Sequence, residues 1–444
     1  MTRRMHLLAS AVAAISIGLA ATPAAHAQAR SAALAPAASP EAVGFDSQRL
    51  KRLDAAMAQA VTDGRVAGMT TLLARHGKVV AFNTYGKASL ETGQPMSKDE
   101  IFRIYSMTKP ITGVAMMILF EEGRWKLDDP VTKFIPEFKD LKVWKGVDAN
   151  GQPILEPVRR PPTMRELISH TAGFGYGLGD KHPVDKMFRE QRVLGSSNLQ
   201  EMTTKVAGIP LIYQPGEQWS YSVAVDLQGH IVEKLSGQTL GQFFESRIFK
   251  PLKMTDTAFS TGQAKASRLA AVYIGNPETG KIEEAKTLFG SPVPTYVSKP
   301  GMESGGGGLV STATDYARFA QMIVNGGELD GVRILAPATV ELMGTNVIPE
   351  AALVSSNGSV SNSFNPHVGF GLDFMVVTDP RKAGTLEGKG TMSWGGAAGT
   401  WFWADPTNDV VFVGMIQRYG GTGGDDLGAL TRTLVYQALT DPAK

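Results

Sequence analysis

Apolar residues recur every three or four positions in several segments of the chain, a spacing typical of amphipathic helices. The pattern predicts helices over residues 47–63, 106–122 and 427–439. Pro110 must lie in or near the first turn of the second helix, because a proline deeper in a helix would break its hydrogen-bond ladder. Gly123 is placed to end that helix.

Runs of β-type residues lie beside these helical patterns at both ends of the chain. Two of them flank His76-Gly77-Lys78 and are typical of an antiparallel hairpin. Near the C-terminus, residues 399–406 and 409–419 are expected to be strands joined by a Pro-Thr-Asn turn. Helices and antiparallel strands, without alternation of strand, helix and strand, predict an α+β fold and argue against a Rossmann sheet.

The same pattern predicts how the chain is divided into domains. Residues 41–124 and 301–444 are expected to form one α/β domain around a central antiparallel sheet flanked by helices. Residues 125–300 are helical pieces and long loops, so we expect them to form a mainly helical inserted domain. A glycine-rich segment then leads into a further helix, where Thr312 and Asp315 are spaced as in a capping box.

The first 27 residues have the pattern of a signal peptide. A basic start is followed by apolar residues 7–21 and by Ala25-His26-Ala27, which matches a small-x-small cleavage site. An apolar stretch of about 15 residues falls short of the roughly 20 that span a bilayer. We therefore expect cleavage near Ala27, a linker over residues 28–40, and export to the periplasm or the medium. No stable membrane insertion is expected after cleavage.

Composition narrows the classes of partner and reaction. The formal net charge is +2 and the leader carries two arginines, so the mature chain is near neutral and we expect no nucleic acid partner. The absence of cysteine excludes thiol catalysis. The histidines show no metal-ligand spacing, and the glycine run 305–308 lacks the GK[ST] of a phosphate-binding loop. We expect no metal and no cofactor, and a glycine run that needs unusual backbone dihedral angles.

Ser106 and Lys109 are the first candidates for chemistry. Positions i and i+3 share one face of a helix, so the lysine ammonium can reach the serine hydroxyl. Alone the pair is a weak signal, because serine is a common helix N-cap and lysine is commonly solvated. The chain has no G-x-S-x-G nucleophile elbow. His170 is expected to brace a turn rather than to serve as the base of a triad.

Five segments occur in the order found in the serine β-lactamase and penicillin-binding-protein superfamily. They are "YSMTK", "MRELISHTAGFGYG", "PGEQWSYSVAVDLQGHIVEKLSG", "GGGGLVSTATDYARF" and "MSWGGAAGTWFWADP". From about residue 45 to its end the chain most resembles the family VIII carboxylesterases, which are relatives of class C β-lactamases. The resemblance implies a β-lactamase/transpeptidase-like fold.

The resemblance also implies roles for the residues in these motifs. Ser106 would attack the carbonyl of the substrate, while Lys109 and Tyr221 would remove its proton and return a proton to the leaving alcohol. Whether the lysine or the tyrosine is the immediate base stays open, because two coupled groups share one titration. The backbone N–H groups of Ser106 and Ala397 would form the oxyanion hole.

Departures from the β-lactamase pattern set the expected substrate. Trp394-Gly395-Gly396 stands where β-lactamases have K-T-G, and Val223 stands where their Y-x-N motif has asparagine. Losing a charge-assisted contact costs a charged ligand roughly 1.5–3 kcal/mol. We therefore expect carboxylic esters of short to medium apolar acyl groups, with Phe174 as a further substrate contact. Other aromatic residues that either line the cleft or pack in the core are Tyr176, Trp401 and Trp403.

Three other functions stay open at this point. A β-lactamase or D-amino-acid peptidase would use the same nucleophile, but Val223 and Trp394 count against it. An acyltransferase would need an acyl-enzyme that outlasts attack by water, a property that the sequence does not show. A non-catalytic binding protein would be expected to lack a working nucleophile, whereas the candidate serine, lysine and tyrosine are all present. The expected partner is a small-molecule ester.

Overall fold

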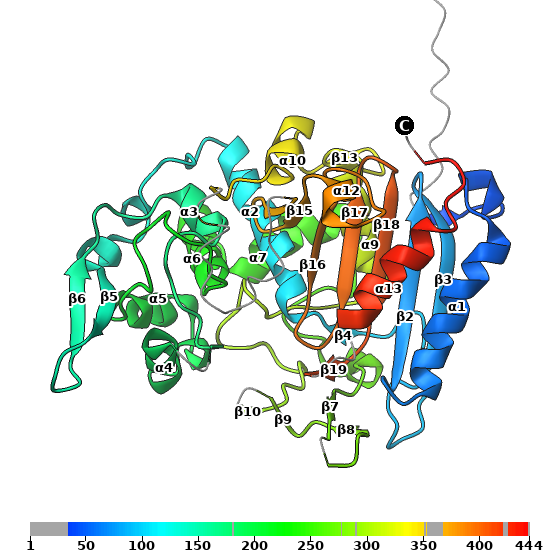
Figure 1. Ribbon diagram of the computed structural model, residues 1–444, viewed down its shortest axis with the longest axis horizontal. Helices are drawn as coiled ribbons and strands as arrows, with labels where there is room; N and C mark the ends of the chain where they lie inside the picture. Colours follow the sequence, from blue (N-terminus) through cyan, green and yellow to red (C-terminus); the bar gives the residue numbers. More distant parts are fainter. Residues whose placement is uncertain are drawn as a thin grey trace, which may run out of the picture. The chain divides into compact units, whose positions relative to one another are not determined.

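The fold is built on an eight-stranded sheet whose strands come from both ends of the chain (Figure 1). The computed structural model describes residues 34–179, 182–276, 278–288, 291–349, 352, 367–420 and 425–442. The strand order is β1-β3-β2-β18-β17-β16-β15-β14. The bounds are β1 (Ala35–Pro36), β2 (Gly68–Arg75), β3 (Lys78–Gly86), β14 (Val368–Phe370), β15 (Met375–Val377), β16 (Met392–Gly395), β17 (Trp401–Asp405) and β18 (Val410–Met415). The two ends of the chain share one sheet, as the sequence predicts.

The sheet is antiparallel except at one edge. β2 and β3 form the expected hairpin, and its turn places His76 and Gly77 at φ angles of 51° and 67°. β1 pairs with β3 in parallel, with Ala35 opposite Lys78. The antiparallel sheet expected from the sequence is thus present, with one short parallel pair at this edge. The physical reason is that β1 reaches the sheet from the segment before the first helix, and not through a hairpin.

Helices cover both faces of the sheet. α1 (Ser47–Thr62) and α13 (Asp425–Tyr436) pack against each other on one face, and α9 (Ala313–Val324) lies on the other (Figure 1). The side chains of β17 alternate between the two faces of the sheet, because successive side chains of a strand point in opposite directions. Trp401 and Trp403 enter the cluster formed with α1 and α13, while Phe402 enters the larger cluster that contains α2 and α9. The two tryptophans are thus core residues on the face away from α2.

The segment 125–300 contains most of the remaining helices. They are α3 (Met164–Ile168), α4 (Pro183–Glu190), α5 (Leu199–Ala207), α6 (Ala224–Ser236), α7 (Leu240–Phe244) and α8 (Lys250–Leu252). The segment also holds the hairpins β5 (Lys142–Val147) with β6 (Pro153–Pro157) and β7 (Tyr273–Gly275) with β8 (Ile282–Glu284). Residues 32–444 form one compact unit, and the domain boundaries near residues 125 and 300 stay a prediction.

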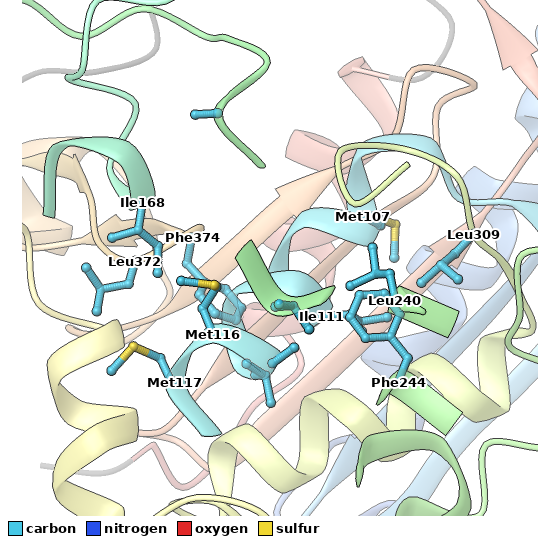
Figure 2. Packing of buried hydrophobic residues seen from close by; sticks show 14 of the residues in the cluster. Met107, Ile111, Met116, Met117, Ile168, Leu240, Phe244, Leu309, Leu372 and Phe374 are labelled. Carbon is cyan, nitrogen blue, oxygen red and sulfur yellow. The ribbon is translucent and has the colours of Figure 1, made fainter. Parts of the chain in front are cut away.

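α2 (Thr108–Glu121) is the central buried helix of the structure. All of its side chains from Thr108 to Leu119 are buried, so it is apolar on every side rather than on a single face. Figure 2 shows Ile168 and Phe374 near Met116, with Leu240 and Leu309 near the start of the helix. This packing holds the first turn of α2, and any polar side chain on it, inside the hydrophobic core.

Short strands bring the glycine run next to the start of α2. β4 (Phe102–Arg103) pairs with β11 (Val310–Ser311), so the chain enters α2 beside the end of the run. The run then enters α9, where the Thr312 side chain accepts the backbone N–H of Asp315 at 3.2 Å. The second half of the predicted capping box is absent here, because the Asp315 carboxylate instead accepts hydrogen bonds from Asp256 and Thr257.

The predicted leader and most of the predicted linker lie outside the described residues. No helix within the part of the chain that the structure describes is long and apolar enough to cross a membrane.

The packing around Trp401 gives a stability prediction with a matched control. A Cβ added to Gly414 of β18 would overlap the rigid Trp401 ring, whereas a Cβ on Gly428 of α13 would meet the same ring at an ordinary 3.8 Å. Gly414→Ala should lower the free energy of unfolding by about 1–3 kcal/mol or more. Gly428→Ala should raise it by about 0.5–1 kcal/mol, because alanine is the better helix former.

Denaturant titration of the two variants beside the wild type measures both changes. Equal stability of Gly414→Ala and the wild type would contradict the packing described here.

Candidate active site

Ser106 lies in a tight turn that precedes α2. Residues Tyr105–Met107 form a 3₁₀ turn and the α-helix begins at Thr108, so the serine stands in the turn before the helix and not at the predicted helix start at residue 106. Tyr105 has a φ angle of 41°, a left-handed conformation that costs a non-glycine residue of the order of 1–3 kcal/mol. The hydroxyl of Tyr316 donates to the Met107 carbonyl at 2.8 Å and helps to hold this turn. The serine is therefore presented from a fixed backbone.

Lys109 is fully buried in the first turn of α2. Its Nζ donates to the Gly306 carbonyl at 2.6 Å, to Tyr176 Oη at 3.1 Å and to Ser106 Oγ at 3.3 Å. These three contacts match the three N–H donors of an ammonium group. Burial alone would lower the pKa of Lys109, but Tyr176, Tyr221 and Asp226 act against it and the pKa is raised above its ordinary value. The structure thus favours the charged form of the lysine.

Tyr221 makes the shortest contact with the candidate nucleophile. Its hydroxyl donates to Ser106 Oγ at 2.6 Å, and Lys109 Nζ lies 4.5 Å from the centre of its ring. Tyr221 reaches this position from the loop that enters α6, three residues before that helix begins. The structure therefore brings Ser106, Lys109 and Tyr221 together from two segments that are more than 100 residues apart.

The rings of neighbouring residues pack around the ring of Tyr221. Its ring centre lies 5.2 Å from His170, 6.2 Å from Trp219 and 5.6 Å from Trp394. His170 Nδ1 pairs with Ser222 Oγ at 2.9 Å, and burial first, with the charge of Lys109 second, lowers the pKa of His170 well below its ordinary value. A neutral, buried histidine in this place supports Tyr221, which agrees with the expectation that His170 is structural.

Tyr176 is a site residue that the sequence analysis left among possible wall or core aromatics. Besides its contact with Lys109, its ring lies 5.3 Å from that of Tyr221 at an interplanar angle of 77°. Asp185 fixes the local backbone by accepting from the N–H groups of Tyr176 and Gly177 at 2.9 and 2.7 Å. The signal in the sequence was a tyrosine between two glycines, since such a site allows close approach of the backbone.

The glycine run 305–308 packs against the site for a reason other than the predicted one. None of its four residues has a positive φ, so unusual dihedral angles are not what requires glycine. A Cβ on Gly305 would come within 2.8 Å of the Val225 carbonyl, and one on Gly306 would overlap Asp226. Gly305 and Gly306 are thus required by the close approach of α6, and Gly308 by the ring of Phe259, whereas a Cβ on Gly307 would meet only ordinary contacts.

Trp394, Gly395 and Gly396 lie at the end of β16 beside the serine turn. Trp394 is half-buried, and its ring centre lies 5.3 Å from Phe370 as well as close to Tyr221. A Cβ on Gly396 would overlap the Ile104 carbonyl, so only glycine allows this approach. Ala397 follows as an exposed residue. Its assignment to an oxyanion hole with Ser106 stays a prediction.

Val223 and Phe174 are nearly inaccessible. Val223 has no exposed surface and caps the start of α6, where its N–H donates to the Gly175 carbonyl at 3.0 Å. Phe174 is 2% exposed and packs with its ring centre 5.3 Å from that of Phe138. Direct contact of either side chain with a substrate stays a prediction, and in this structure both support neighbouring site residues.

The described residues contain no group of three or more His, Asp or Glu side chains placed to hold a metal ion.

Comparison with known proteins finds relatives over most of the chain. The family model described as Beta-lactamase matches residues 53–437. The protein Rv1367c of Mycobacterium tuberculosis is 35% identical over 361 residues, which are 80% of this chain and 86% of that protein. Esterase EstB of Burkholderia gladioli is 33% identical over 379 residues, 82% of this chain and 89% of that protein.

A solved structure also matches most of the chain. The structure of "EstCE1, a hydrolase with promiscuous acyltransferase activity" matches with a TM-score of 0.70 at 28% identity, covering 88% of this chain and 99% of that chain. The α+β fold expected from the sequence is thus confirmed.

The hydroxyl contacts around Ser106 predict its reactivity towards a fluorophosphonate. Tyr221→Phe should slow labelling of Ser106 by about 10²-fold or more, because the ring stays packed while the proton acceptor is lost. Tyr176→Phe should slow it less, since the Tyr176 hydroxyl is hydrogen-bonded to Lys109 rather than to Ser106. Intact-mass measurement of the labelled fraction over time gives these rates.

Tyr213→Phe is the matched control. Tyr213 is also a buried phenol, but its hydroxyl donates to the His170 carbonyl at 3.4 Å and lies outside the hydrogen bonds of Ser106 and Lys109. Labelling of Tyr221→Phe at the rate of Tyr213→Phe would contradict the role given to the Tyr221 hydroxyl.

Proposed function

Because the chain belongs to the beta-lactamase family, we propose that it is a serine hydrolase that cleaves carboxylic esters through an acyl-enzyme on Ser106. The observation that carries this proposal is the position of Ser106 Oγ, 2.6 Å from Tyr221 Oη and 3.3 Å from Lys109 Nζ. A serine needs such an adjacent proton acceptor to act as a nucleophile. The 33% identity with Esterase EstB supports ester hydrolysis as the reaction class.

The geometry favours Tyr221 as the immediate base. Loss of one proton from Lys109 and Tyr221 together gives either a neutral pair or an ammonium beside a phenolate, and both states hold the same number of protons. Lys109 is surrounded by acceptors that favour its ammonium form, and its contact with Ser106 is the longer one. The phenolate of Tyr221 would then take the Ser106 proton as Oγ attacks the ester carbonyl.

Tyr221 carries a proton in each of the two half-reactions. When the tetrahedral intermediate collapses, the bond from the carbonyl carbon to the alcohol oxygen breaks and Tyr221 Oη–H protonates the leaving alcohol. Water then loses a proton to the Tyr221 phenolate and attacks the acyl-enzyme carbonyl. When this second intermediate collapses, the bond from the carbonyl carbon to Ser106 Oγ breaks, Tyr221 Oη–H protonates Oγ, and the carboxylic acid is released. The N–H groups of Ser106 and Ala397 would each stabilise the oxyanion by about 3–4 kcal/mol.

The wall of the site supports an apolar, uncharged acyl group as the substrate. Trp394 presents aromatic surface next to Tyr221 where a β-lactamase would carry a cation, and the buried ring of Phe370 packs against it. A carboxylate-bearing ligand would lose roughly 1.5–3 kcal/mol without that cation, whereas a neutral ester would not. This charge difference is the reason to prefer esters over β-lactams and D-amino-acid peptides.

Acyl transfer to an alcohol is a second candidate. EstCE1, which is 28% identical to this chain, is a hydrolase with promiscuous acyltransferase activity. Adding 1-butanol to the ester assay separates the two, because transfer yields the butyl ester and hydrolysis yields the free acid.

The substrate class is tested with p-nitrophenyl esters of short and medium acyl length beside nitrocefin. The wild type should hydrolyse the esters with far higher kcat/KM than nitrocefin, and Ser106→Ala should lose at least about 10³-fold in kcat. Release of p-nitrophenol measures both. Strong nitrocefin turnover with negligible ester cleavage would point to a β-lactamase, and unchanged ester cleavage in Ser106→Ala would remove this serine from the mechanism.

We also propose that the chain is exported after cleavage near Ala27. The support is the basic start, apolar stretch and small-x-small site of residues 1–27. N-terminal sequencing of protein recovered from the periplasm or medium of a bacterial host should begin close to Gln28. Recovery of the full-length chain from the cytoplasm alone would contradict export.

A further inference from the structure

A buried carboxyl group lies close to Lys109 and is joined to it through Gly306. Asp226, in the first turn of α6, has no exposed surface. Its Oδ1 accepts from Ser304 Oγ at 2.5 Å and from the Gly306 N–H at 3.1 Å. The carbonyl of Gly306 is in turn the closest acceptor for Lys109 Nζ, at 2.6 Å. One residue of the glycine run therefore joins the carboxylate to the ammonium.

The carboxyl group of Asp226 and the hydroxyl of Tyr176 both lie next to Gly306. A Cβ at Gly306 would overlap Asp226 Oδ2 and would lie 3.0 Å from Tyr176 Oη. Asp226 Oδ2 has no hydrogen-bond partner among the described residues. Burying a carboxylate with one oxygen lacking a hydrogen bond costs free energy unless a positive charge is near. Lys109 is the cation that acts on Asp226.

A second buried carboxyl near Lys109 has a different environment. Asp373 Oδ1 accepts from Gln228 Nε2 at 3.2 Å, while Asp373 Oδ2 and Gln228 Oε1 have no partner among the described residues. A protonated Asp373 would donate from Oδ2 to Oε1 and satisfy both atoms at once. Burial raises the pKa of Asp373 well above its ordinary value, in agreement with a neutral acid.

The other titratable groups that face Lys109 are uncharged in the resting site. His170 is neutral because burial and the charge of Lys109 hold its pKa down. Burial raises the pKa of Tyr176, which keeps that phenol protonated. Asp226 thus remains as the carboxylate that faces Lys109. Burial holds the pKa of Asp226 above its ordinary value, and Lys109 and the donors Ser304 and Gly306 limit that rise.

We propose that Asp226 is a positioning residue that keeps the proton of the Lys109–Tyr221 pair on Lys109, so that Tyr221 receives the proton of Ser106. The inference rests on the proposed function, because it assigns protons within the same site. A nearby anion stabilises the ammonium relative to the neutral amine and so favours the ammonium–phenolate state over the neutral pair.

The sign of the effect on pH dependence follows from the charges. Activity needs the pair to lose one proton, which takes its charge from +1 to zero. The negative charge of Asp226 opposes that loss. Removing the charge should therefore let the pair lose its proton at lower pH, and the acidic limb of the kcat/KM profile should move to lower pH.

The test is the pH profile of p-nitrophenyl ester hydrolysis by Asp226→Asn. The acidic limb should move down by about one pH unit or more, as expected for loss of a charge close to a titrating group. At the plateau, kcat should fall by about tenfold because the phenolate state is less populated, with KM little changed.

Asp373→Asn is the matched control. An asparagine there can form the same two-point pair with Gln228 without a titrating proton, so its acidic limb should coincide with that of the wild type. Ser304→Ala covers the case in which Asp226→Asn does not fold. Losing one donor makes Asp226 bind a proton more readily, so the limb should move in the same direction by a smaller amount.

The outcomes separate the two proposals. If the wild type hydrolyses the ester but the acidic limb of Asp226→Asn stays in place, the inference is overturned and the proposed function is not. The acidic limb of Ser304→Ala decides in the same way if Asp226→Asn does not fold. A limb that moves equally in Asp373→Asn would also overturn it, because Asp226 would then have no special place. A wild type without ester hydrolysis would overturn the proposed function and this inference with it.

Discussion

The burial of Lys109 is the constraint on which the rest of the site depends. An ammonium group without exposed surface must have every donor satisfied and an opposite charge nearby, or folding would neutralise or expel it. The chain meets this demand with groups from four segments: the serine turn, the loop of Tyr176, the loop and first turn of α6, and the glycine run. The same groups that stabilise the lysine therefore fix the serine and the tyrosine around it.

This constraint explains why the site lies on rigid elements. α2 is buried on all sides and holds Lys109 in place, while Tyr221 is clamped among His170, Trp219 and Trp394. A base that touches the nucleophile at 2.6 Å needs little movement to accept its proton. Trp394 is half-buried and packs on the buried ring of Phe370, so a residue that supports Tyr221 would also meet the substrate in the proposed reaction.

The sequence predicted the fold and the central residues of the site, but not what surrounds Lys109. The helices near residues 47, 106 and 427 and the β2–β3 hairpin follow from local periodicity, so they were readable. Ser106, Lys109 and Tyr221 were found because motifs in a known order carry them. The contact between Asp226 and Gly306 beside Lys109 was not predicted, since a contact between residues 80 apart has no local signal. The parallel pairing of β1 was missed for the same reason.

The most direct test of the central claim is to trap the acyl-enzyme. Wild-type protein is mixed with p-nitrophenyl butyrate, quenched in acid during the first turnover, and mapped by mass spectrometry of its peptides. A butyryl group on the peptide that contains Ser106, absent from Ser106→Ala treated in the same way, is the result that the account expects. Rapid ester turnover with no adduct on that peptide, or with the adduct on another residue, would contradict it.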